Sequence, residues 1–374
     1  MSKNHNTFSN IFDEIVNYKN FKKAYDRTQK TNTKYKNASI KFSFDLIYNL
    51  EKLKEKVSNG TYKPKKYNIF KVHEPKERVI AAPKFEDKIV QFAVHNVIND
   101  DFERKFIHDS YACQKDKGTH AAADRIQHFL GKAKWQWGNP WIVKADIRKF
   151  FYSIDHKILK KILDKKIKCQ RTLKLLFKII DNSPDEVGLP EPYYDNKFYV
   201  GLPLGNVTSQ LFANLYLNEL DQYCKRKLSL KYYVRYMDDM GVIVKTRNKA
   251  KIIKKKMSEF VKRKLNLKMN KRKTKIFPLA QGLNMVGYKI WPTHKLLRNS
   301  TKKRIKQKLS KFKRLIKENK ISISKVEQIL NSWKGHADHA SSENFYRYLE
   351  NRFNYIFRDN EDSFKVKKEV FANG

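Results

Sequence analysis

Cysteine, acidic residues and long apolar runs are all scarce in this sequence. The three cysteines, Cys113, Cys169 and Cys224, are isolated and form no CxxC pair, which argues against a zinc site and is typical of proteins in a reducing cytosol. No stretch approaches the roughly 20 apolar residues that a membrane-spanning helix needs, and residues 1–10 are too polar for a signal peptide. We therefore expect a cytoplasmic protein without a membrane partner.

What the sequence has in excess is positive charge. Lysine and arginine number 81 against 38 aspartates and glutamates, which gives a formal net charge of +43. A field of this strength favours a polyanionic partner, and nucleic acid is the first choice. At 374 residues with 40% hydrophobic content, the chain is long enough for a sizeable core and more than one subdomain.

The segment 231–245 reads KYYVRYMDDMGVIVK and has the pattern of a β-hairpin. Two runs of aromatic and β-branched residues flank a short turn that carries Asp238 and Asp239. Adjacent aspartates on a lone hairpin usually do no more than form the turn. A second acid changes this interpretation, because Asp146 ends another apolar strand pattern that begins at Trp141.

Two strands that each end in aspartate would build a two-metal site if folding brought them side by side. Carboxylate oxygens are the ligands that Mg²⁺ prefers. Two such ions, roughly 3.5–4 Å apart, clamp the attacking and leaving oxygens of a phosphoryl transfer. The sequence therefore predicts that Asp146, Asp238 and Asp239 meet at one site.

Two segments resemble sequence boxes of reverse transcriptases. Tyr236–Met237–Asp238–Asp239 resembles their YxDD box, and 141–151, WIVKADIRKFF, resembles their first palm motif. The resemblance runs from about Gly60 into the C-terminal helices, in the family's order. It implies an α+β right-hand polymerase fold, whose parts would be an N-terminal extension (1–40), fingers (41–140), a palm (141–290, with a fingers-side excursion at about 165–200) and an α-helical thumb (291–374). No ribonuclease H, protease or HNH-type endonuclease motif follows the predicted thumb.

The activity that this resemblance implies is RNA-directed DNA polymerisation, in which a nucleotidyltransferase adds dNTPs to a 3′-OH. Asp146, Asp238 and Asp239 are the implied catalytic residues. Together with Ile147 they are also the implied ligands of two Mg²⁺ ions, for which Mn²⁺ could substitute.

The resemblance also implies a nucleotide-binding set. Lys76 and Arg78 lie on a predicted hairpin within 67–82, which in the family presents cations to the triphosphate, and arginine suits bidentate phosphate contacts. Phe151 matches the steric gate that crowds a ribose 2′-OH. Leu204, Gly205 and Gln210 belong to the segment 200–210, VGLPLGNVTSQ, which resembles the family's second palm motif. Lys273 or Lys275 matches a palm lysine near the triphosphate, with Lys273 taken as the candidate, and a solvated charge run is the alternative.

Leu204 departs from the pattern of many reverse transcriptases, which carry Gln at this position. An aliphatic residue here resembles the diversity-generating retroelement branch, whose enzymes copy a template RNA with errors opposite adenine. Loss of an amide near the nucleotide would remove a hydrogen bond that helps to hold the correct geometry. Two other classes stay open: an anti-phage defence enzyme that makes templated, untemplated or protein-primed DNA, and a catalytically inactive RNA-binding protein.

The implied partners are a structured template RNA, an RNA/DNA duplex and dNTPs, in a bacterial or phage-encoded system. A small basic accessory protein is a further expectation, and the oligomeric state is open. Met285, Gly287 and Tyr288 match the family's primer grip. A helix predicted within 295–320 has an apolar stripe and a cationic face that suits duplex phosphates.

Local patterns add several structural expectations. Apolar spacing predicts one helix over 42–58, with Phe44 and Ile47 on its apolar face, and another over 331–348. Asp155 is expected to be the N-cap of the following helix rather than a metal ligand. Three histidines are expected to cap or pack rather than to catalyse or bind metal: His120, His336 and His339.

Overall fold

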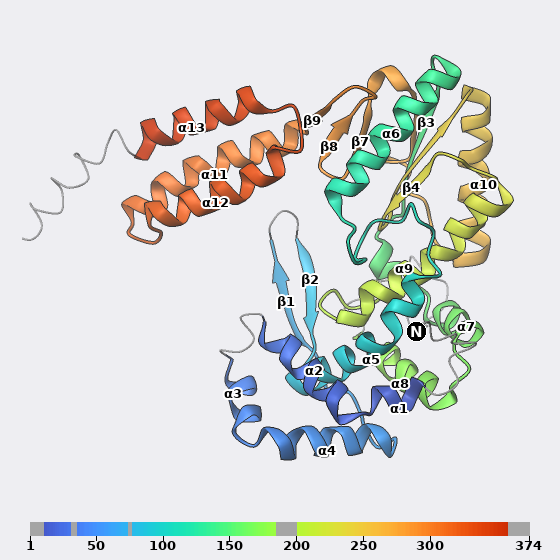
Figure 1. Ribbon diagram of the computed structural model, residues 1–374, viewed down its shortest axis with the longest axis vertical. Coiled ribbons are helices and arrows are strands. Elements are labelled where there is room, and N and C mark those ends of the chain that lie inside the picture. Colours follow the sequence, from blue (N-terminus) through green and yellow to red (C-terminus); the bar gives the residue numbers. More distant parts are fainter. Residues whose placement is uncertain (1–10, 31–35, 74–76, 185–199, 358–374) are drawn as a thin grey trace, which may run out of the picture. The chain divides into compact units, whose positions relative to one another are not determined.

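The computed structural model describes residues 11–30, 36–73, 77–184 and 200–357 (Figure 1). The chain divides into two compact units, one formed by 1–116, 145–240 and 251–275 and the other by 117–144, 241–250 and 276–374. Each combines α-helices with antiparallel β-structure, which confirms the expected α+β class. Among the described residues, no helix is both long and apolar enough to cross a membrane.

Helix α5 (Phe85–Glu103) is the central helix of the first unit. Helices α1 (Ile11–Ile15), α2 (Tyr18–Gln29) and α9 (Val207–Gln222) pack against it. Because it is covered on several sides, its apolar residues do not form a single stripe. The other helical segments of this unit are α3 (Asn37–Phe44), α4 (Leu46–Ser58), the 3₁₀ helix η2 (Phe150–Ser153), α7 (His156–Lys166), α8 (Gln170–Asp181) and the π-helix η4 (Tyr223–Lys227).

Strands β1 (Asn68–Val72) and β2 (Arg78–Ala82) form the predicted antiparallel hairpin of the first unit. Its base is anchored, because the buried Ala81 donates its backbone N–H to the carbonyl of Leu204 at 3.1 Å. At Gly205, where φ is +139°, an added Cβ would lie 2.6 Å from the Ala81 carbonyl oxygen. Only glycine fits here without a shift of backbone.

The predicted aspartate hairpin is confirmed within a four-stranded sheet of order β4-β5-β3-β6. Strands β4 (Tyr233–Tyr236) and β5 (Asp239–Val244) are neighbours, and Met237 and Asp238 form the turn between them. Strand β3 (Trp141–Asp146) is the next strand after β5. Helix α10 (Arg247–Leu265) follows β5 in the chain and leads to β6 (Lys275–Pro278).

The second unit contains α6 (Thr119–Trp137), which packs on a three-stranded antiparallel sheet. Its strands are β7 (Leu283–Met285), β8 (Tyr288–Ile290) and β9 (Lys295–Leu297), preceded by the 3₁₀ helix η5 (Leu279–Gln281). Helices α11 (Asn299–Lys317), α12 (Ile323–Ala337) and α13 (Glu343–Phe357) lie side by side (Figure 1). The apolar stripe predicted within 295–320 is confirmed, because its residues Ile305, Leu309 and Phe312 are buried among these helices.

The prediction of one helix over 42–58 is wrong. Asp45 leaves the helical conformation with φ −130° and ψ 64°, and the side-chain amide of Asn49 donates to the carbonyl of Phe42 at 3.1 Å, which closes the end of α3. Phe44 and Ile47 are consequently 84% and 70% exposed. The apolar spacing continued across a break that the local backbone imposes.

The prediction of one helix over 331–348 is wrong for a similar reason. The segment divides between α12 and α13, and the hydroxyl of Ser342 in the connection donates to the carbonyl of Ala337 at 2.7 Å. Both helices bury their apolar residues in the same core, so the periodicity persists through the connection. The predicted N-cap is confirmed, because Asp155 Oδ1 accepts the backbone N–H of Ile158 at 3.1 Å.

Candidate active site

The structure brings the three predicted aspartates together. The backbone N–H of Ile147 donates to the carbonyl of Asp238 at 3.3 Å, so Asp146 lies beside the turn that carries Asp238 and Asp239. Burial and the negative charge of Asp146, with a smaller effect of Asp239, raise the pKa of Asp238 to about 6. The first unit thus holds three carboxylates close enough to repel one another.

Lys273 offsets part of this negative charge. Its Nζ donates to Oδ2 of Asp146 at 2.7 Å. Burial alone would lower the pKa of Lys273, but the hydrogen bond to Asp146 and its charge raise that pKa overall. The segment that carries the lysine is fixed to β3, because the backbone N–H of Asn270 donates to the Asp146 carbonyl at 2.8 Å.

The donor set at this site fits Mg²⁺. Three carboxylates supply the hard oxygen ligands that Mg²⁺ prefers. Oδ1 of Asp146 is buried and, in the part of the chain that the structure describes, receives no hydrogen bond. No group of three or more acidic, histidine or cysteine side chains is closed around an ion position among those residues. The ammonium of Lys273 is hydrogen-bonded to Oδ2 of Asp146, so a metal ion must displace it or bind through Oδ1.

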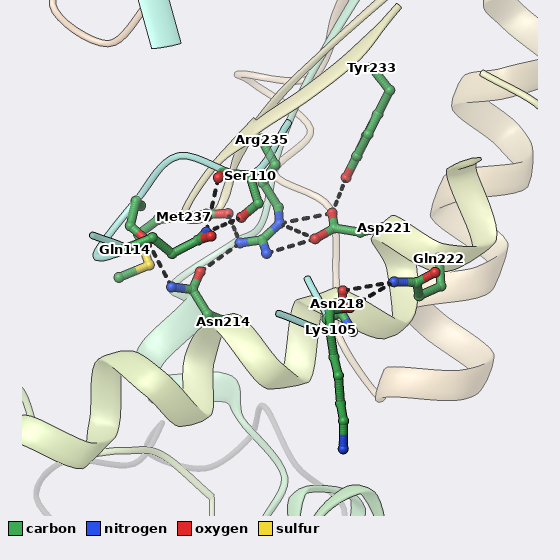
Figure 2. A network of polar contacts seen from close by, with 11 residues as sticks. Lys105, Ser110, Gln114, Asn214, Asn218, Asp221, Gln222, Tyr233, Arg235 and Met237 are labelled. Carbon is green, nitrogen blue, oxygen red and sulfur yellow. Dashed lines mark hydrogen bonds and ion pairs between the residues drawn. The ribbon is translucent and has the colours of Figure 1, made fainter. Parts of the chain in front are cut away.

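A buried ion pair is bonded to the turn that carries Asp238 and Asp239 (Figure 2). Arg235 and Asp221 are both fully buried, and Nε and Nη2 of the arginine donate to the carboxylate at 2.7–2.9 Å. Tyr233 donates its hydroxyl to the same carboxylate at 2.6 Å. The remaining nitrogen, Nη1, donates to the side-chain carbonyl of Asn214 at 3.0 Å and to the backbone carbonyl of Met237 at 3.1 Å.

This network holds the backbone of the aspartate turn. Met237 has φ +51°, a left-handed conformation that costs a non-glycine residue free energy. The guanidinium of Arg235 compensates by binding the Met237 carbonyl, directly before Asp238. Sequence reasoning missed this role of Arg235 and Asp221. The only sign of this network in the sequence was an arginine within an aromatic and β-branched strand pattern. A charge in such a strand needs a partner.

Backbone hydrogen bonds join some of the segments that carry the candidate nucleotide-binding residues. The carbonyl of Phe151, whose ring is half-buried, accepts the N–H of Leu202 at 2.8 Å, and the same glycine-containing segment carries Leu204 and Gly205 against β2. Arg78 is exposed at the start of β2, and Gln210 is exposed near the start of α9. Lys76 lies outside the described residues.

The candidate primer grip lies in the second unit. Met285 and Tyr288 are buried, while Gly287 is half-buried. The hydroxyl of Tyr288 donates to the carbonyl of His336 at 2.7 Å. His120 stacks on His339 with ring centroids 3.6 Å apart, so these histidines pack as expected. A contact of this segment with a primer stays a prediction.

Lys273→Met should tighten Mg²⁺ binding. Methionine keeps the length of the side chain but removes the ammonium that competes for Asp146, so we expect the Mg²⁺ dissociation constant to fall by about three- to tenfold. The increase in Tm on titration with Mg²⁺ measures this constant. Lys275→Met, a change at an exposed lysine of β6, is the control. Unchanged or weaker binding in Lys273→Met would contradict competition.

Asp238→Asn should stabilise the metal-free protein at pH 7.5, by about 1–2 kcal/mol, because it removes a carboxylate that is costly to ionise. The folded-state pKa of about 6 lies above the ordinary value of 3.8, so stability is lost as pH rises between these values. The gain should therefore be nearly absent at about pH 4 and complete above pH 6. Urea unfolding in EDTA at both ends of this range tests it. An equal gain at both pH values would exclude charge as the cause.

Arg235→Lys should weaken Mg²⁺ binding by about tenfold, because lysine cannot bind Asp221 in bidentate fashion and also hold the Met237 carbonyl. Circular dichroism and Mg²⁺ titration of the same preparation separate folding from site geometry. Arg226→Lys, at an exposed position of η4, is the control. A lower Tm with an unchanged Mg²⁺ dissociation constant would show that Arg235 serves stability alone.

Known proteins with similar sequences share the region that contains this site. Residues 63–290 match the family described as reverse transcriptase (RNA-dependent DNA polymerase). Group II intron-encoded protein LtrA of Lactococcus lactis subsp. cremoris is 26% identical over 306 residues, which cover 64% of this chain and 49% of LtrA. Protein YkfC of Escherichia coli K12 is 27% identical over 281 residues, covering 66% of this chain and 72% of YkfC. The chain thus spans about half the length of LtrA.

Solved structures add a more distant likeness. Apo telomerase from Candida tropicalis, truncated from its C-terminal domain, aligns with 14% identity and a TM-score of 0.47, over 67% of this chain and 60% of that one. The family match is the finding that shows the family of this chain. It covers more than half of the chain and includes Asp146, Asp238 and Asp239. The mixed helices and antiparallel sheets agree with the right-hand polymerase fold of that family. The chain belongs to the reverse transcriptase (RNA-dependent DNA polymerase) family.

Proposed function

We propose that this chain is an RNA-directed DNA polymerase that adds dNTPs to a 3′-OH. The observation that carries the proposal is the hydrogen bond from the Ile147 N–H to the Asp238 carbonyl, which holds Asp146 beside the Asp238–Asp239 turn. Asp146 and Asp238 would hold two Mg²⁺ ions, with Ile147 contributing backbone and Asp239 supporting. Such ions lower the pKa of the attacking 3′-OH and neutralise the leaving pyrophosphate.

The surrounding residues have roles that follow from their chemistry. Arg78, exposed at the start of β2, would bind the triphosphate through its planar guanidinium, with Lys76 as a second cation. The half-buried ring of Phe151 would exclude a ribose 2′-OH. Lys273 would offset the charge of Asp146 until another cation takes its place, and its ammonium would then become available to phosphate.

Asp238→Asn should reduce primer extension on an RNA template by about a thousandfold or more, because the amide removes one anionic metal ligand. The dissociation constant for the RNA/DNA duplex should stay within about threefold, since phosphate contacts dominate nucleic-acid affinity. Asp155→Asn is the matched control, because asparagine also caps a helix and extension should persist. Retained extension in Asp238→Asn would refute the assignment of this site.

Within the family, we propose error-prone copying of a structured RNA, as in a diversity-generating retroelement. The relatives named above include an intron-encoded protein, and Leu204 is the residue that favours the diversity-generating branch. Its backbone carbonyl accepts the N–H of Ala81, so the half-buried Leu204 is fixed to the base of the β1–β2 hairpin. An aliphatic side chain there supplies no amide to a nucleotide. A small basic accessory protein stays a prediction.

Leu204→Gln should restore a hydrogen-bonding amide and lower the frequency of errors opposite template adenine, by about three- to tenfold. Sequencing of the DNA made from a defined RNA template, with Mg²⁺ and dNTPs, measures this. Leu204→Met is the control, since methionine stays apolar and should keep the errors. The same error spectrum in all three proteins would refute the role of Leu204. Repetitive DNA with no matching template would favour the defence function instead.

A further inference from the structure

A cationic groove lies on the first unit, next to the strand that carries Asp146. Its volume is about 1010 Å³, and one wall is the face of α10 that carries Ser258. The segment after α10 forms the floor. Arg148 donates its backbone N–H to the Lys268 carbonyl at 2.9 Å, which ties this floor to the residues after β3. Six cations line the groove: Arg148, Lys254, Lys262, Lys268, Lys271 and Arg272.

Among the residues that the structure describes, no acidic side chain lines the groove to offset this charge. Within the residues that the structure describes, none of the five cations Lys254, Lys262, Lys268, Lys271 and Arg272 forms an ion pair. Clustered like charges raise the local potential and attract polyanions. The groove therefore has the charge of a surface that attracts anions, and the three carboxylates nearby do not account for it.

The spacing of the lysines matches a nucleic-acid backbone rather than a nucleotide. Lys254 and Lys262 are eight residues apart on α10, which corresponds to about 12 Å along the helix axis. One strand of a duplex carries about three or four phosphates over that length. In the described part of the chain no aromatic side chain lines the groove, so these residues offer no stacking platform of the kind that proteins use for single strands.

We propose that this groove binds the phosphate backbone of a double-stranded RNA segment, apart from the site where the primer is extended. The choice of RNA rests on the proposed function, in which a folded RNA contains the template. Lysines recognise such a segment by charge and shape rather than by sequence. Because the groove floor is bonded to the residues around Asp146, RNA docked there is anchored beside the site that copies it.

The test compares two triple variants of equal charge change on the full chain. Lys262→Gln/Lys268→Gln/Lys271→Gln removes three exposed cations of the groove, and Lys255→Gln/Lys256→Gln/Arg263→Gln removes three exposed cations of α10 that do not line it. The probe is a blunt RNA hairpin of about 16 base pairs, the length that double-stranded RNA-binding domains cover. It has no primer end, so polymerisation does not contribute.

The groove variant should bind the hairpin about tenfold or more weakly than wild type, and the slope of log K against log salt should fall by about two to three. The α10 control should stay within about threefold of wild type. Equal losses in the two variants would overturn the proposal. If the groove triple does not fold, Lys262→Gln and Lys271→Gln as single variants should each lose affinity, and no loss in either would overturn it.

Two further arms identify the ligand. A DNA hairpin of the same sequence should lose less affinity than the RNA hairpin, and an equal loss would overturn the assignment to RNA. The KM for dNTP on a short pre-annealed RNA/DNA duplex should be unchanged in the groove variant, and an increase of about tenfold would reassign the groove to nucleotide entry. Asp238→Asn should bind the hairpin normally, so failure of the polymerase proposal and failure of this one are separable.

Discussion

Repulsion between three carboxylates at the end of one sheet is the constraint on which the candidate site depends. Asp146 and the adjacent pair Asp238–Asp239 must lie close to share metal ions, yet burial makes their joint ionisation costly, as the raised pKa of Asp238 shows. The ammonium of Lys273 relieves this cost at Asp146. One ammonium does not balance three carboxylates, so the site keeps a negative charge that favours a divalent cation.

A second electrostatic device acts on the backbone rather than on the carboxylates. The ion pair of Arg235 and Asp221 is fully buried, and such a pair is a weak source of stability, because desolvation offsets the attraction. Its value here is positional, since the same guanidinium binds the carbonyl of Met237 at the turn. The strained φ of Met237 is thus maintained at the turn that carries the two aspartates.

The lysines and arginines of this chain do not all have the same role. Lys273 is committed to Asp146, and Arg235 to a buried network. By contrast, five cations of the groove beside α10 form no ion pair among the described residues: Lys254, Lys262, Lys268, Lys271 and Arg272. The cations behind the net charge of +43 therefore have different roles: one offsets part of the negative charge of the site, one holds its turn, and those of the groove would attract a polyanion.

The sequence by itself determined the elements whose signal is local: the aspartate hairpin, the strand that ends at Asp146, the cap at Asp155 and the stripe of α11. It did not determine where the helices over 42–58 and 331–348 break, because apolar spacing continued across both connections. Only the tertiary structure decided that Lys273 binds Asp146, that Arg235 holds the Met237 carbonyl and that a groove forms beside α10. These features join residues far apart in the chain, and a partner supplied by folding leaves no periodic signal in the sequence.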